Sequence, residues 1–118
     1  MKIVYISLTG NVESFVDNLS LEAIEIISGT EEVDDDFIVI TNTVDHGEID
    51  FALEDFLDDN VEKIKGVAAS GNHGYDPDFA VSADTIAKQY NVPIIHKFED
   101  EGTEEDVKIV EDFIKTLL

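Results

Sequence analysis

The 118-residue chain contains no cysteine, which excludes disulfides, thiolate catalysis and cysteine-ligated clusters. No apolar run approaches the roughly 20 residues of a membrane-spanning helix. The three histidines, His46, His73 and His96, include no pair at the i, i+4 spacing of a helical metal site, so we predict no bound metal. The N-terminus enters a strand-like run without a signal-peptide pattern, and we therefore expect a cytoplasmic protein.

Basic residues are scarce. The chain has 7 Lys and Arg residues and 28 Asp and Glu residues, which gives a net charge of −21. Nucleic acid is a poor candidate partner, because its phosphates are bound by cations, and an anionic membrane is excluded by the same sign argument. The charge favours a basic protein partner and a monomeric chain, although solubility alone would also account for it.

Apolar runs alternate with amphipathic segments along the chain. The runs predict strands over 2–6, 23–27, 37–40, 66–69 and 92–98, and the segments predict helices over 12–19, 50–59, 79–90 and beyond Thr103, which is a good N-cap. The acidic stretch 28–36 predicts a loop. This alternation indicates one α/β domain over residues 1–118, with helices packed on both faces of a five-stranded parallel sheet.

Three loops that follow predicted strands share an unusual composition. The stretches 7–11, 41–49 and 70–78 each begin with a hydroxyl residue, and each contains glycine and asparagine. Ligands of open parallel sheets bind beyond the carboxyl ends of the strands, so these loops predict a binding site. Turn geometry alone would also account for glycine and asparagine in any one of them.

The first loop, Ser7-Leu8-Thr9-Gly10-Asn11, has the arrangement of a phosphate cradle between a strand and a helix. It carries no Lys or Arg, so the phosphate would be held by neutral donors. The Lys of a triphosphate-binding loop and the G-x-G-x-x-G of a dinucleotide fold are both missing. A receiver domain would need acidic residues at the end of the first strand, whereas this chain has Tyr5-Ile6-Ser7 there. A monophosphate is the best remaining fit.

Several stretches of the sequence resemble those of known protein families. Ser7-x-Thr9-Gly10-Asn11 resembles the flavin mononucleotide (FMN) phosphate loop of flavodoxins, which usually have a second Thr where this chain has Val12. Four further stretches resemble the NrdI family, whose members are small flavodoxin-like partners of class Ib ribonucleotide reductase: 66–72, 90–93, 97–99 and 102–107. The resemblance covers essentially the whole chain.

The resemblance implies a flavodoxin-like three-layer sandwich with strand order 2-1-3-4-5 and a bound FMN. The reduced flavin of such a protein reacts with O₂ and supplies a superoxide-type oxidant, which assembles the dimanganese–tyrosyl radical cofactor of the reductase small subunit. The resemblance also implies an upstream reductant, and a role as activating partner rather than as an autonomous enzyme, with no catalytic residue.

Carried over position by position, the resemblance implies three groups of FMN-binding residues. Those around the phosphate are Ser7, Leu8, Thr9, Gly10, Asn11 and Val12. Those on one side of the isoalloxazine are Thr41, Asn42, Thr43 and Gly47, and those of the other wall are Ser70, Gly71, Asn72 and Tyr75. Gly47 tolerates both signs of φ, and we assign it to a peptide that flips with the flavin redox state.

Two other functions remain open on the sequence. One is a general flavodoxin, a diffusible electron carrier with no role in radical assembly. The other is a flavin-free adaptor that keeps the fold and binds proteins through its acidic surface.

Overall fold

The computed structural model describes residues 1–8, 10–43, 48–72 and 80–118. Five strands form one parallel sheet in the order β2-β1-β3-β4-β5. They are β1 (Lys2–Tyr5), β2 (Ala23–Glu25), β3 (Phe37–Asn42), β4 (Ile64–Gly71) and β5 (Ile94–Glu99). The predicted strand order is confirmed.

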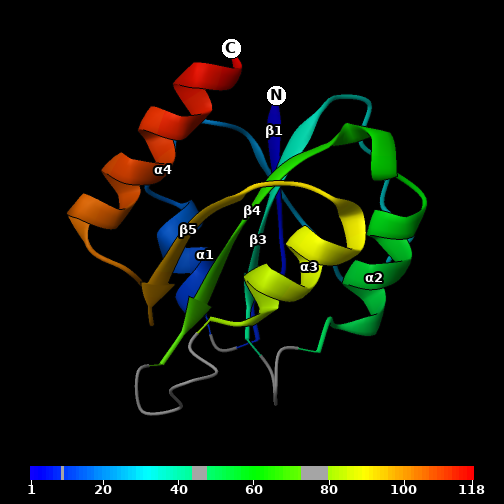
Figure 1. Ribbon diagram of the computed structural model, residues 1–118, viewed down its shortest axis with the longest axis horizontal. Helices are drawn as coiled ribbons and strands as arrows, with labels where there is room; N and C mark the ends of the chain where they lie inside the picture. Colours follow the sequence, from blue (N-terminus) through cyan, green and yellow to red (C-terminus); the bar gives the residue numbers. More distant parts are fainter. Residues whose placement is uncertain (9, 44–47, 73–79) are drawn as a thin grey trace.

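Helices cover both faces of this sheet. They are α1 (Asn11–Val16), α2 (Phe51–Asp58), α3 (Ser82–Tyr90) and α4 (Glu104–Leu117), with a 3₁₀ turn η1 (Val61–Lys63) before β4. Figure 1 shows α1 and α4 on one face, at the left, and α2 and α3 on the other. The strands point their carboxyl ends toward the bottom of that view, away from both chain termini. The predicted three-layer sandwich is therefore confirmed.

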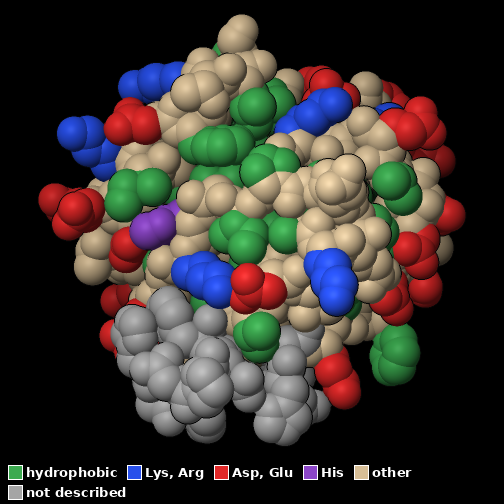
Figure 2. All heavy atoms as spheres, in the orientation of Figure 1, with side chains coloured by type: hydrophobic (Ala, Val, Ile, Leu, Met, Phe, Trp, Pro, Cys, Tyr) green, Lys and Arg blue, Asp and Glu red, His purple; other side chains and the backbone are tan. Residues whose placement is uncertain are grey.

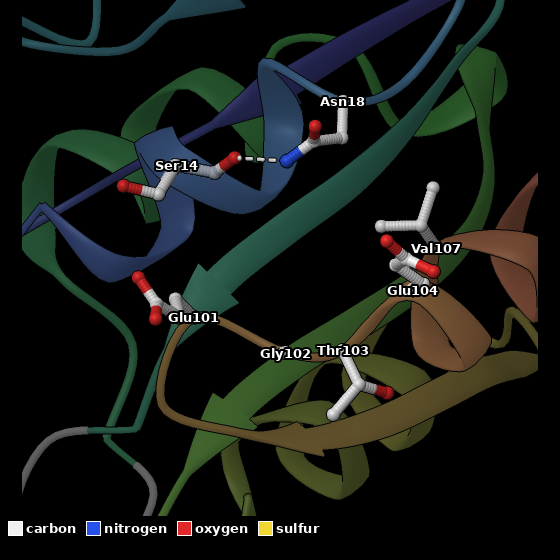
Figure 3. Close-up of a pocket in the computed structure, with 7 residues that line it drawn as sticks. All are labelled: Ser14, Asn18, Glu101, Gly102, Thr103, Glu104 and Val107. Carbon is white, nitrogen blue, oxygen red and sulfur yellow. Dashed lines mark hydrogen bonds between the residues drawn. The ribbon is translucent and has the colours of Figure 1, made fainter.

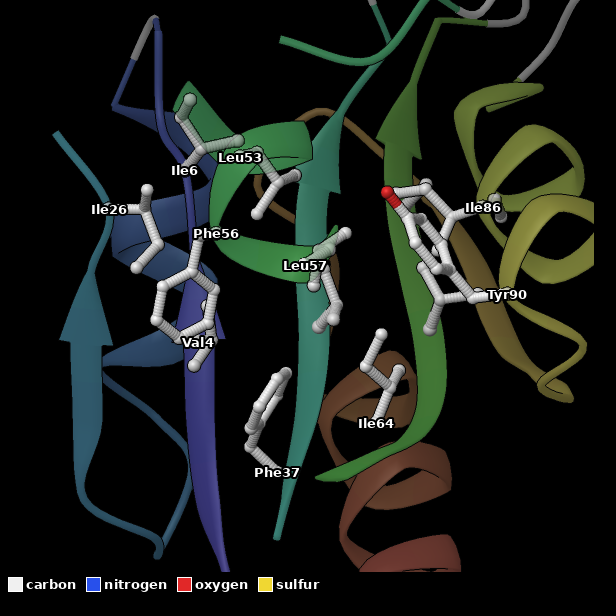
Figure 4. Close-up of a cluster of buried hydrophobic side chains, with 14 of the residues drawn as sticks. Val4, Ile6, Ile26, Phe37, Leu53, Phe56, Leu57, Ile64, Ile86 and Tyr90 are labelled. Atoms are coloured by element: carbon white, nitrogen blue, oxygen red, sulfur yellow. The ribbon is translucent and has the colours of Figure 1, made fainter. Parts of the chain in front are cut away.

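The core on the α2 and α3 face is built from aromatic and branched side chains. Phe56 of α2 and Phe37 of β3 lie with ring centroids 5.5 Å apart, and both are fully buried. Figure 4 shows Phe56 and Leu57 directed from α2 onto the strands, with Ile86 and Tyr90 of α3 on the neighbouring part of the sheet. The helical periodicity of 50–59 predicted this face, since Leu53, Phe56 and Leu57 are its buried residues.

The core on the other face centres on a stacked pair, Phe15 of α1 and Phe98 of β5, whose ring centroids are 4.0 Å apart. The predicted buried residues of the first helix are confirmed, and they are Val12, Phe15, Val16 and Leu19. The last helix differs from its prediction. Only Val110 and Ile114 are buried, whereas the other predicted core residues, Val107, Phe113 and Leu117, are half-buried. The reason is that α4 packs chiefly on β5, which is an edge strand, so a narrow stripe of the helix faces the sheet.

Three strands extend beyond their predicted carboxyl ends, β5 by the single residue Glu99 and the other two further. β3 reaches Asn42 and β4 reaches Gly71, because the parallel ladder continues through the pairs Thr41–Ala69 and Asn42–Ser70. Ladder bonds use backbone groups, so polar side chains do not end the strands there. Four residues predicted in loops therefore occupy the last positions of β3 and β4, namely Thr41, Asn42, Ser70 and Gly71. The acidic stretch 28–36 holds no helix or strand, as predicted.

Candidate functional site

The loop after β1 is tied to the end of β3. The backbone N–H of Leu8 donates to Oδ1 of Asn42 across 2.9 Å. The N–H of Glu13, in the first turn of α1, donates to Oγ of Ser7 across 3.2 Å. The Ser7 hydroxyl accepts in this bond and so keeps its own proton for donation. These two bonds fix the loop between a strand end and a helix.

Gly10 sets the course of the same loop. Its φ of +89° lies in the left-handed region, which glycine adopts without a steric penalty. A Cβ at this position would meet no heavy atom within 4 Å, so the loop has open space beside its backbone. The side chain of Val12, two residues on, is fully buried in the core and has no donor, so this residue can offer a ligand only its backbone N–H. An anion at this loop would meet backbone N–H groups and the Ser7 hydroxyl.

The end of β3 brings two threonines to the same edge. Thr41 is buried, and its Oγ1 donates to the carbonyl of Asn42 across 3.1 Å. Oγ1 of Thr43 is also buried and has no hydrogen-bond partner in the part of the chain that the structure describes. Buried hydroxyls are normally paired, so Thr43 has an unused donor and acceptor at the strand end. A polar ligand group at this edge would pair with it.

Two hydrogen bonds to Asp100, the residue after β5, hold the end of β4. Oγ of Ser70 donates to the carbonyl of Asp100 across 2.5 Å, and the N–H of Asp100 donates to the carbonyl of Gly71 across 3.0 Å. A Cβ on Gly71 would lie 2.4 Å from the backbone nitrogen of Ala80, so only glycine fits there. The Ser70 hydroxyl is therefore bonded to the turn after β5. Sequence reasoning assigned Ser70 to a ligand wall and missed this bond.

The described parts of the three loops lie at one edge of the sheet. Asn42 pairs with Ser70 across the sheet and bonds to Leu8, so the ends of β1, β3 and β4 meet at one edge. Asn11 opens α1 beside this edge, and Asn72 directly follows β4. Three predicted site residues, Thr9, Gly47 and Tyr75, lie outside the described residues.

A groove that sequence reasoning missed adjoins this edge. It has a volume of about 420 Å³ between α2 and α3, and Leu8 is one of its lining residues. Its other walls include Phe51, Glu54, Thr85 and Gln89. The hydroxyl of Tyr90 donates to Oδ1 of Asp58 across 2.7 Å and so joins α3 to α2 beside the groove. Burial, and then this bond, raise the pKa of Tyr90 above its ordinary value.

A second hollow lies on the opposite face, between α1 and the start of α4. Figure 3 shows Ser14 of α1 and Asn18, in the turn after it, across from Thr103 and Glu104. The hollow has a volume of about 370 Å³, and Glu101 also lines it. Two carboxylates and no cation make it unsuitable for a phosphate. The β1 loop therefore remains the candidate anion site.

Among the described residues, no three His, Asp or Glu side chains are grouped so that they could hold a metal ion. None of their helices is both long enough and apolar enough to cross a bilayer.

The strand order and the helices on both faces of the sheet define a flavodoxin-like fold. A short-chain flavodoxin associated with a non-canonical PDU bacterial microcompartment superposes with a TM-score of 0.73 at 25% identity, covering 99% of this chain and 97% of the other. A Fusobacterium nucleatum flavodoxin bound to flavin mononucleotide shares the fold with a TM-score of 0.54 at 17% identity, covering 98% and 95%.

The sequence defines the family more narrowly. Residues 3–112 match the family model described as NrdI Flavodoxin like. Protein NrdI of Bacillus licheniformis is 44% identical over 109 residues, which cover 92% of this chain and 83% of that relative. The chain belongs to the NrdI flavodoxin-like family.

Proposed function

We propose that the chain binds FMN at the edge where β1, β3 and β4 end, and that it serves a class Ib ribonucleotide reductase as its flavoprotein activator. The observation that carries the proposal is the bond between Leu8 N–H and Asn42 Oδ1, because it joins the phosphate loop to the loop expected beside the ring. A ligand with a monophosphate at one end and a flat polar ring at the other matches that pair of loops.

The residues present fit the two ends of FMN. Backbone N–H groups and the Ser7 hydroxyl would hold the phosphate beside Gly10, where the chain leaves open space. Oγ1 of Thr43, which has no partner among the described residues, would bond to a polar atom of the ring. Thr9 and Asn11 would complete the phosphate loop, and Thr41, Gly47, Gly71, Asn72 and Tyr75 would surround the ring. Ser70 would contribute through its backbone, since its hydroxyl is bonded to Asp100.

Bound FMN would supply the one-electron chemistry that the role requires. An upstream reductant would supply the electrons, and one-electron reduction of O₂ would give a superoxide-type oxidant. This oxidant would be used by the small subunit to assemble its dimanganese–tyrosyl radical cofactor. The chain's own residues hold the flavin, control its exposure to O₂ and present it to the partner.

Two measurements test the proposal in sequence. The purified protein, alone and after addition of FMN, should show the visible absorption of a bound flavin. The reduced holoprotein, mixed in air with the manganese-loaded small subunit, should then produce a tyrosyl radical detectable by electron paramagnetic resonance. A colourless protein that takes up no FMN would instead favour a flavin-free adaptor.

The similarity to a short-chain flavodoxin supports a second candidate, a general electron carrier. The yield of tyrosyl radical in the small subunit distinguishes a general electron carrier from a reductase activator. A carrier would hold FMN and exchange electrons, yet the small subunit would gain no radical above the level produced by free reduced FMN.

A further inference from the structure

Two large apolar side chains are exposed where the phosphate loop meets the groove between α2 and α3. The side chain of Phe51 is 85% exposed and that of Leu8 is 56% exposed, and both line the groove together with Ile49. Exposed apolar side chains that line the same groove mark a candidate binding surface. Among the residues that the structure describes, none covers the apolar wall of the groove.

The groove has an acidic rim. Glu48, Asp50 and Glu54 line it, and no Lys or Arg does so among the described residues. Between Lys2 and Lys63 the sequence has no Lys or Arg, so none stands in α2 itself or in the segment that precedes it. Figure 2 shows acidic side chains gathered along the side of the molecule that α2 covers, at the right of the view. An occupant of the groove must therefore bring positive charge.

The described walls of the groove are fixed before anything binds. Asp50 caps α2 by accepting from the N–H of Ala52 across 2.9 Å, which holds Phe51 as the first helical residue. Nε2 of Gln89 donates to Oε2 of Glu54 across 3.1 Å and links α3 to α2 over the groove. A wall held in this way gives a partner a surface that needs little ordering on binding.

We infer that this groove is the docking surface for the protein partner, and that the partner inserts an apolar side chain flanked by Lys or Arg. The inference rests on the proposed function and adds the contact face to it. Leu8 belongs both to the groove and to the phosphate loop, so a partner seated here lies beside the flavin site. A second copy of this chain is a poor occupant, because each copy carries a net charge of −21.

The test measures the affinity of the FMN-loaded protein for the class Ib reductase small subunit by biolayer interferometry. Phe51→Ala removes the apolar anchor, and Ile109→Ala is its control, because Ile109 is an exposed apolar residue of α4 on the opposite face. Glu54→Lys reverses one rim charge, and Asp112→Lys makes the same change in net charge on α4. Flavin absorbance and the thermal melting temperature of each variant are recorded alongside.

Phe51→Ala is expected to weaken binding by about tenfold or more, as loss of an aromatic anchor does. Glu54→Lys is expected to weaken it several-fold at low salt and to reduce its salt dependence, while Ile109→Ala and Asp112→Lys bind as the parent protein does. Equal affinity of Phe51→Ala and parent, with flavin content unchanged, would overturn the docking surface. Failure of the parent protein itself to bind FMN or the small subunit would instead refute the proposed function.

Discussion

Leu8 and Asn42 stand 34 positions apart in the sequence, and a 2.9 Å hydrogen bond from the Leu8 amide to the Asn42 side chain joins them. The bond connects the loop after β1 with the last residue of β3. Each of these segments on its own is a strand end with a turn beside it. Joined by this bond, they form one continuous rim, where the proposed FMN would place its phosphate at one half and its ring at the other.

Replacement of Asn42 by alanine should loosen this rim. The variant loses one neutral hydrogen bond, worth roughly 0.5–1.5 kcal/mol, so the dissociation constant for FMN should rise about two- to tenfold. Quenching of flavin fluorescence on titration measures this constant directly.

Asn60→Ala is the matched control for that experiment. The Asn60 side chain also donates one bond, to the carbonyl of Phe56 across 2.8 Å, but at the far end of α2. The control should lose stability without losing FMN affinity. If both variants bound FMN as the parent protein does, the Leu8–Asn42 bond would have no part in holding the flavin.

Two glycines with similar backbone angles should respond differently to alanine. Gly10 has a φ of +89° and open space around it, so Gly10→Ala should cost only the backbone strain of about 1–2 kcal/mol. Gly102 has a φ of +77°, and its Cβ would lie 2.7 Å from Cδ1 of Phe15. Gly102→Ala should therefore add a packing cost of roughly 1–3 kcal/mol to the strain.

Urea unfolding of the flavin-free protein compares the two glycine variants without a contribution from the ligand. The Phe15–Phe98 stack is the neighbour that must move in the second variant, so its loosening accompanies the larger loss. An equal loss of stability in the two variants would contradict the close packing around Gly102.

Glu31 should make folding stability depend on pH in the acid range. Burial opposes its ionisation, but the N–H groups of Ser28, Ile27 and Gly29 donate to its carboxylate and lower its pKa from 4.5 to about 2. The folded pKa lies below the unfolded one. The stabilisation is thus complete above pH 4.5 and is lost as the pH falls to about 2.

Glu31→Gln tests this dependence, with Glu32→Gln, an exposed neighbour, as control. Unfolding free energies are measured at neutral pH and at several values down to about pH 2. The Glu31 variant should be less stable than the parent at neutral pH, and the difference should shrink with acidification. A difference that stays constant with pH would show that the ionised carboxylate is not the stabilising form.

The sequence predicted most of the fold because local patterns and global architecture agree. Apolar runs fixed the positions of the strands, and the spacing of Leu53, Phe56 and Leu57 gave the buried face of α2. The N-cap at Thr103 is also confirmed, since its side chain accepts from the N–H of Asp106 across 3.2 Å and Asp106 bonds back to it. Such features depend on residues only a few positions apart.

The features that the sequence did not predict depend on distant parts of the chain. The Ser70 hydroxyl bonds to Asp100, 30 residues away, and nothing in the composition of either loop indicates that pairing. The spacing of Leu53, Phe56 and Leu57 places Phe51 off the buried face of α2, as the structure shows. It gave no sign that Phe51 lines a groove together with Leu8, which lies 43 residues earlier in the chain.

Leu8 contributes its backbone to one surface and its side chain to another. Its amide holds Asn42 at the candidate flavin site, and its exposed side chain lines the groove next to Phe51. A partner that moves this side chain also acts on the amide behind it. Thermodynamic reciprocity then requires that any factor by which the partner changes flavin affinity is the factor by which flavin changes partner affinity.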